Sequence, residues 1–123
     1  MEGEVFNNEL ELAKKGATDP KKQDAAKIII GKTRYDLISP TALEALGKVY
    51  TYGAAKYADR NMEKGTEWSK YFGAMMRHAW AFWRGEDIDK ESGLPHLSHA
   101  AWCCFTLLDY MVYHKDKDDR RKI

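Results

Sequence analysis

The chain has 123 residues, enough for one domain with a real core, and a charged fraction of 32% suits a helical protein with a small core and a hydrated surface. Twenty Lys and Arg residues nearly balance nineteen Asp and Glu residues, and this net charge of +1 excludes a polyanion binder held by bulk charge. We therefore expect no nucleic-acid partner. The sequence has no apolar run long enough for a membrane span and no signal-peptide core at its acidic start, so we expect no membrane association and a cytoplasmic location.

The N-terminal quarter of the sequence is polar. Residues 1–30 are predicted to form a polar arm or a short helix, ending in the β-branched triplet at 28–30. This triplet is too short to anchor a sheet, so residues 28–38 are predicted to be extended chain on the surface of a helical body. Residues 31–114 are predicted to be the helical domain, and residues 115–123 a solvated, charged tail.

The first predicted helix follows Ser39 and Pro40, which suit the N-cap and the first helical position. Residues three and four positions apart then mark one helix face. They are Leu43, Leu46, Tyr50, Gly53 and Tyr57. The helix is predicted to end near residues 59–61, where polar residues interrupt this period.

Two further helices are predicted after Gly65. The second starts at a Thr66 cap, ends at Gly85 as its C′ residue, and has a stripe that is predicted to be buried. The stripe consists of Trp68, Phe72, Met76, Ala79 and Trp83. The third starts at Pro95 and runs to about His114, and it is apolar nearly all round, which favours a central position and buried cysteines at 103 and 104. We therefore predict an all-α fold with three main helices, an extended N-terminal segment, and a helical bundle completed by homo-oligomerisation.

The loop EDIDKESGL is short enough to make the second and third helices antiparallel neighbours. Imidazole and carboxylate groups should then converge at one end of this helix pair. The candidate metal ligands are His78, Glu86, Asp89, His96 and His99. Histidine favours Mn, Fe, Co or Zn over Mg. In the alternative interpretation, Glu86 and Asp89 cap the third helix, and the histidines are ordinary core or surface groups.

A second group of residues, around GAAKYADRNMEKGTEW, has the composition of a nucleotide pocket. Cations would bind phosphate, an aromatic ring would face the base, and an amide would contact the base edge. The candidates are Lys56, Tyr57, Arg60, Asn61 and Trp68, with Arg77 as a second phosphate clamp. Alternatively, the cations only complement the helix C-terminus, and Arg77 is a surface arginine.

Two segments carry a family resemblance. GKTRYDLISPTALEALGKVYTYGAAKYADRN and RHAWAFWRGEDIDKESGLPHLSHAAWCCFTLL resemble a bacteriophage-associated family described as the N-terminal domain of dATP/dGTP diphosphohydrolases, over about residues 31–108. The resemblance implies a small cytosolic enzyme, similar to all-α nucleoside-triphosphate pyrophosphohydrolases, which cut between the α and β phosphates. Those enzymes usually carry Glu-x-x-Glu and Glu-x-x-Asp on successive helices. Here Glu86-x-x-Asp89 lies in a loop, and His96 and His99 follow.

The leading hypothesis is metal-dependent hydrolysis of a purine (deoxy)nucleoside triphosphate to the monophosphate and pyrophosphate. Glu91 or Asp87 is predicted to orient the attacking water. The alternative is a non-catalytic phage protein that sequesters a host defence nucleotide signal in the host cytoplasm. A structural or interaction protein is a third interpretation.

Overall fold

The computed structural model describes residues 31–122, so the predicted N-terminal arm or helix lies outside the described residues. The chain divides into two compact units, at 1–39 and 40–123. In the described part of the first unit, residues 35–37 form a short 3-10 helix, η3 (Tyr35–Leu37), where the sequence predicted extended chain. Its turn is accompanied by a two-pronged contact from the guanidinium of Arg34 to the carboxylate of Asp36, at 2.8 and 2.7 Å.

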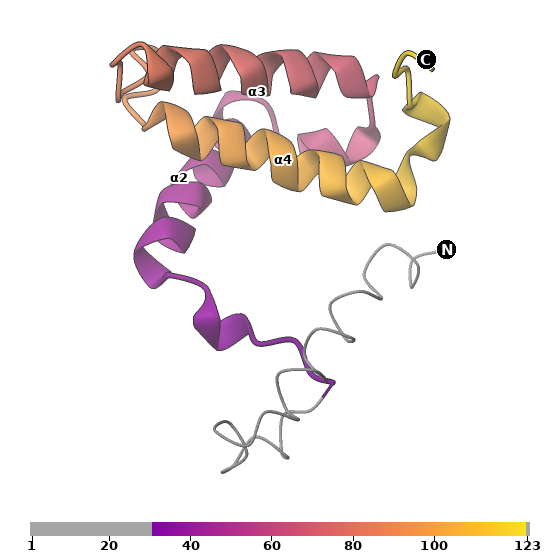
Figure 1. Cartoon of the computed structure of the whole chain (residues 1–123), viewed down its shortest axis with the longest axis horizontal. Coiled ribbons are helices and arrows are strands. Elements are labelled where there is room, and N and C mark those ends of the chain that lie inside the picture. Colours follow the sequence, from indigo (N-terminus) through magenta and orange to yellow (C-terminus); the bar gives the residue numbers. More distant parts are fainter. Residues whose placement is uncertain (1–30, 123) are drawn as a thin grey trace. The chain divides into compact units, whose positions relative to one another are not determined.

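Three α-helices make up most of the second unit (Figure 1). They are α2 (Pro40–Lys56), α3 (Trp68–Trp83) and α4 (His96–Tyr113), with short 3-10 helices η4 (Asn61–Lys64) and η5 (Lys115–Lys117). α3 and α4 run antiparallel and side by side, and α2 packs against α4. Residues 31–122 contain no strand, only one isolated bridge between Ile88 and Pro95. The all-α prediction with three main helices is therefore confirmed.

Local signals placed some helix ends correctly, but the predicted Thr66 cap is wrong, since the N-cap of α3 is Glu67 and no side chain caps that end. α2 begins at Pro40, as predicted, but it ends at Lys56, and Arg60 then adopts a positive φ of 54° that no helix can include. α3 ends at the predicted glycine. Gly85 has a φ of 97°, and its N–H donates to Phe82 O while the N–H of Glu86 donates to Ala81 O, which is the Schellman arrangement.

The core lies where α4 meets α2 and α3, and α4 contributes most of it. The buried residues are Leu46 and Val49 from α2, Trp68 and Ala81 from α3, and His96, Ser98, Ala100, Cys103, Thr106 and Tyr110 from α4. The central position predicted for the third helix is thus confirmed. The hydroxyl of Tyr110 donates to the carbonyl of Met62 and so ties α4 to η4.

The predicted buried stripe of α3 is wrong for most of its large members. Trp68 is buried, but Phe72 is 52% exposed, Met76 38% and Trp83 76%. The side of α3 that packs against α4 is the one next to this stripe, as Tyr71 shows. Its ring packs edge-on against Trp102 and Tyr110 of α4. For the same geometric reason, Cys103 is buried and Cys104 is exposed, since consecutive helical residues point about 100° apart.

The described residues of the C-terminal tail, 115–122, are exposed, as their charges suggested, but the tail also contacts α3. The carboxylate of Asp119 accepts hydrogen bonds from the backbone N–H of Ser69, at 2.9 Å, and from its hydroxyl. The guanidinium of Arg120 lies 4.7 Å from the ring centre of Trp68. The tail therefore covers the first turn of α3, where backbone N–H groups have no helical partner. No helix within residues 31–122 has both the length and the apolar character needed to cross a bilayer.

Replacing Gly65 with Ala is expected to destabilise the fold by about 1–3 kcal/mol. Gly65 has a φ of 87°, and a Cβ there would lie 2.6 Å from Nδ1 of His114. The imidazole of His114 is itself held by the carbonyl of Glu63, at 2.8 Å. Thermal or denaturant unfolding would measure the loss.

The matched control is Gly47→Ala, in the interior of α2, where a Cβ meets no atom within 4 Å. Ala is the better helix former there, so this variant should be neutral or more stable than the parent, by up to about 1 kcal/mol. Equal stability of the two variants would contradict the predicted clash at Gly65.

Candidate functional site

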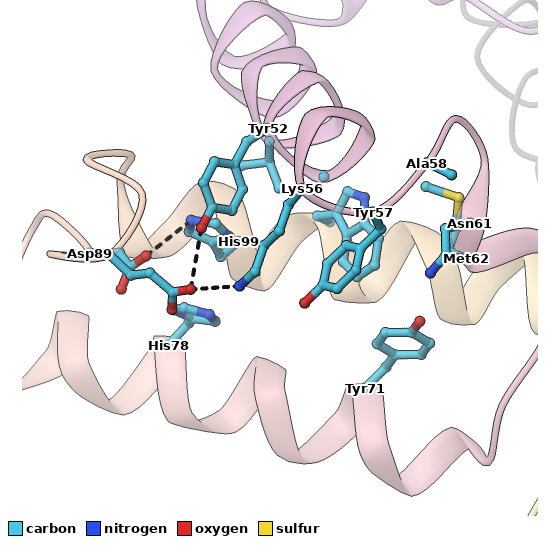
Figure 2. A pocket seen from close by; sticks show the side chains of 14 residues that line it. Tyr52, Lys56, Tyr57, Ala58, Asn61, Met62, Tyr71, His78, Asp89 and His99 are labelled. Atoms are coloured by element: carbon cyan, nitrogen blue, oxygen red, sulfur yellow. Dashed lines mark hydrogen bonds and ion pairs between the residues drawn. The ribbon is translucent and has the colours of Figure 1, made fainter.

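A cavity of about 310 Å³ lies between the C-terminal half of α2 and the facing sides of α3 and α4 (Figure 2). Its wall comes from four separate stretches of the sequence, within residues 49–62, 71–78, 89–91 and 99–102. The lining residues are Val49, Tyr52, Gly53 and Lys56 of α2, Tyr57, Ala58, Asn61 and Met62 after it, Tyr71 and His78 of α3, Asp89 and Glu91 of the α3–α4 loop, and His99 and Trp102 of α4. The predicted nucleotide group and the predicted metal group thus contribute to one cavity.

A cation and a carboxylate face each other within this cavity. Nζ of Lys56 donates to Oε1 of Glu91 at 2.5 Å, and the hydroxyl of Tyr52 approaches the same oxygen at 3.4 Å. The hydrogen bond to Glu91 raises the pKa of Lys56, and in turn the bond from Lys56 lowers the pKa of Glu91. Both side chains are exposed, so an incoming anion can compete with Glu91 for the ammonium group.

The hydrogen bonds around Ser92 fix the tautomer of His99. The Ser92 hydroxyl lies 2.7 Å from Oδ2 of Asp89 and 2.7 Å from Nε2 of His99, and it accepts the N–H of Leu94 at 3.2 Å. Burial raises the pKa of Asp89, but hydrogen bonds from Ser92 outweigh this and hold the pKa below its usual value. Because an ionised carboxylate only accepts, Ser92 donates to Asp89 and accepts from Nε2–H of His99. Nδ1 of His99 therefore has the free lone pair.

A second chain of contacts supports His78. Nδ1 of His78 and Nδ1 of His96 are 2.9 Å apart and share a hydrogen bond. Nε2 of the buried His96 lies 3.5 Å from Oε2 of Glu86 and has no hydrogen-bond partner within the part of the chain that the structure describes. With its proton on Nε2, toward the carboxylate, His96 accepts from His78, and His78 keeps a lone pair on Nε2.

The two histidines that line the cavity are held in the neutral form. Burial lowers the pKa of His78, and the neighbouring His99 and His96 lower it further. Burial also lowers the pKa of His99, against the opposing effect of Asp89. Neutral imidazoles with a free lone pair can accept a proton or bind a metal ion.

The convergence predicted for the metal group is present. The carboxylates of Glu86 and Asp89 each lie 3.5 Å from a histidine Nε2. However, no group of three or more His, Cys, Asp or Glu side chains within residues 31–122 is arranged to hold a metal ion. The rings of His78 and His99 are stacked, with their centroids 4.6 Å apart and an interplanar angle of 14°.

The alternative in which Glu86 and Asp89 cap the third helix is also not what the structure shows. The N-cap position of α4 is Pro95, and no side chain caps that end. Asp89 instead accepts from the backbone N–H and hydroxyl of Ser92 within its own loop. The backbone N–H of His96, at the start of α4, donates a hydrogen bond to the carbonyl of Asp87.

Several predicted site residues lie outside the cavity lining. Trp68 is buried, and its indole N–H donates to the carbonyl of His114 at 3.0 Å, because this large ring belongs to the core. Arg60 is exposed and lies 3.7 Å from Glu63, and Arg77 is exposed on α3. Asp87 is also exposed and does not line the cavity, whereas Glu91 does.

Three aromatic residues that the sequence analysis did not propose for the site form part of the wall: Tyr52, Tyr71 and Trp102. Tyr57 and Tyr71 reach into the pocket from opposite sides (Figure 2). Tyr71 and Trp102 pack edge-on at 5.3 Å. Helical spacing gave a usable signal, since Tyr71 lies two turns before His78 and Tyr52 one turn before Lys56. No comparable pattern pointed to Ser92.

Comparisons with known proteins agree on one family. The profile described as "dATP/dGTP diphosphohydrolase, N-terminal" matches residues 22–120. A protein named dATP/dGTP diphosphohydrolase, from Salmonella phage PMBT28, is 31% identical over 91 residues, which are 74% of this chain and 31% of that protein. The chain thus spans about a third of the length of this curated relative. No solved structure matches.

Proposed function

Because this chain belongs to the dATP/dGTP diphosphohydrolase N-terminal domain family, we propose that its cavity binds a purine deoxynucleoside triphosphate and supports hydrolysis between the α and β phosphates. The observation that carries this proposal is the single cavity lined both by Lys56, Tyr57 and Asn61 and by neutral histidines beside carboxylates. One group suits recognition of a nucleotide, and the other suits proton transfer.

Lys56 is the cation that faces the cavity, and we assign it to the triphosphate. A phosphate oxygen would replace Glu91 at the ammonium group, since both partners are exposed and a charge-assisted contact to phosphate is at least as strong. The base would then lie toward Tyr57 and Tyr71, with the amide of Asn61 at its edge. The displaced Glu91 becomes free to orient water, as the sequence analysis proposed.

The reaction needs one water molecule. Its oxygen would bond to the α-phosphorus, the bond from that phosphorus to the oxygen bridging the β phosphate would break, and pyrophosphate would leave beside the monophosphate. The proton lost by the water needs an acceptor, and Glu91 or the free lone pair of His78 or His99 can supply one. A requirement for Mn, Fe, Co or Zn stays a prediction from the residue types. The attack of water, the departure of pyrophosphate and the proton transfer described above involve only groups of this chain and the nucleotide.

The test is direct product analysis. The purified full chain, stripped with a chelator, is incubated with each of the four deoxynucleoside triphosphates and with Mn, Co, Zn or Mg in turn. We expect dATP or dGTP to give the monophosphate and pyrophosphate on ion-exchange chromatography, with Mn or Co more effective than Mg. Recovery of intact purine nucleotide from every incubation would exclude hydrolysis.

A second function is favoured by one observation. His78 and His96 hydrogen-bond to each other, His99 hydrogen-bonds to Ser92, and no metal-ligand group is formed within residues 31–122, while Lys56, Tyr57 and Asn61 all line the cavity. A non-catalytic protein that sequesters a nucleotide signal would need only those last three residues. It would bind nucleotide without turnover and release it unchanged on denaturation.

A further inference from the structure

An apolar surface lies on the side of α3 and α4 that faces away from the cavity. We call it the outer face and define it by Phe72, Met76, Trp80 and Trp83 of α3 and Leu97, Phe105, Leu108 and Met111 of α4. On α3, Phe72, Met76 and Trp83 are four and seven residues apart and so form one stripe. This stripe is rotated by about 100° or more from the cavity residues Tyr71 and His78.

The stripe on α4 meets the stripe on α3. Leu97, Leu108 and Met111 are eleven and three residues apart, which places them along one side of α4. His99 and Trp102, which line the cavity, point elsewhere around the same helix. The sulfur atoms of Met75 and Cys104, which lie between the two stripes, are 3.2 Å apart. Cys104 is four residues before Leu108 and seven before Met111, so it lies on the same side of α4 as that stripe.

The outer face is large for a monomer. Its eight side chains are each between 36% and 76% exposed. Given about 150–250 Å² for each aromatic side chain, the exposed apolar area is on the order of 800 Å². The largest patch on a typical monomer is about 300–600 Å², whereas each partner in a standard interface contributes about 800 Å².

The outer face also has no charged side chain. Asp109 is the one Asp, Glu, Lys or Arg residue of α4. Burial raises the pKa of Tyr50 in α2, and the negative charge of Asp109 raises it further. Asp109 therefore lies on the side of α4 that faces α2. Arg77 and Arg84 lie three residues before and four residues after Trp80, at the edge of the outer face. An uncharged centre with charge at its edge resembles a protein–protein interface, whose centre is depleted of charged residues and whose rim is polar.

We propose that the outer face is the two-fold interface of a homodimer, in which two α3–α4 pairs form a four-helix bundle. A second copy fits because a pair of antiparallel helices with one apolar side is the half-bundle that an identical half completes. In a two-fold dimer, the uncharged outer face of one copy also packs against the uncharged outer face of the other. This proposal is independent of the proposed function, because the cavity lies on the opposite side of the helix pair.

The test is the mass of the full chain in solution, measured by sedimentation equilibrium at tens of micromolar. We expect twice the 14.2 kDa of one chain. Leu108→Glu and Trp83→Glu each place a charge in the interface, and each should weaken dimerisation more than a hundredfold. Leu43→Glu is the matched control, because Leu43 is a similarly exposed leucine on α2, outside the face, and this variant should stay dimeric.

Circular dichroism would show whether each variant keeps its helices. If Leu108→Glu unfolds, Trp83→Glu decides the question, because Trp83 is the most exposed member of the face, at the end of α3. A parent chain with the mass of one copy overturns the proposal, as does a folded Trp83→Glu variant that is still dimeric. The first result would leave the outer face to a different protein or a further domain.

Discussion

Replacing His78 and His99 together with Ala is expected to reduce hydrolysis of purine deoxynucleoside triphosphates by about 10²–10⁴-fold, the usual contribution of general acid–base groups. Both rings line the cavity, and both keep a free lone pair by the hydrogen bonds of Ser92 and His96. Affinity for nucleotide should fall far less, because Lys56, Tyr57 and Asn61 are unchanged. Initial rates of pyrophosphate release and calorimetric titration would separate the two effects.

The control for this prediction is His114→Ala. His114 lies at the end of α4, outside the cavity lining, and contacts Glu63 and Gly65. Its loss should change the melting temperature and leave the rate per folded molecule intact. Unchanged turnover in the double His78 and His99 variant would assign the chemistry to other groups. A rate that falls only in proportion to lost folded protein would assign these histidines a structural role.

Replacing Lys56 with Ala is expected to weaken nucleotide binding by roughly ten- to a hundredfold, whether the protein hydrolyses its ligand or only holds it. The reason is the loss of one charge-assisted phosphate contact, worth about 1.5–3 kcal/mol. Lys56 is the one Lys or Arg residue among those that line the cavity. Calorimetric titration with dATP and dGTP would give the change in Kd.

Two further variants make this result specific. Lys48→Ala removes an exposed cation from the same helix but outside the cavity, and its affinity should match the parent. Lys56→Ala also leaves Glu91 unpaired, so its carboxylate would repel phosphate. Lys56→Ala combined with Glu91→Ala removes that repulsion, and a loss of affinity that persists reports the phosphate contact itself. Parental affinity in both Lys56 variants would move the phosphate site away from α2.

Much of the fold was predictable because its signals are local. Pro40 marks the start of α2, and Gly85 supplies the positive φ that ends α3, so each helix boundary depends on residues within one turn. The shortness of the loop after Gly85 requires α3 and α4 to be antiparallel neighbours. The approach of the carboxylates at 86 and 89 to the histidines of α4 follows from that requirement alone.

The sequence by itself therefore determined the three helices, the approach of the carboxylates at 86 and 89 to the histidines of α4, and the family. Only the tertiary structure decided which side of each helix is covered, because Trp68 and Phe72 share a stripe in sequence, yet one is buried and the other is exposed. It also decided the roles of Ser92, which orients His99, and of Asp119, which covers the start of α3. Short polar side chains have no periodicity that reveals their partners, and these hydrogen bonds form only where packing brings separate segments together.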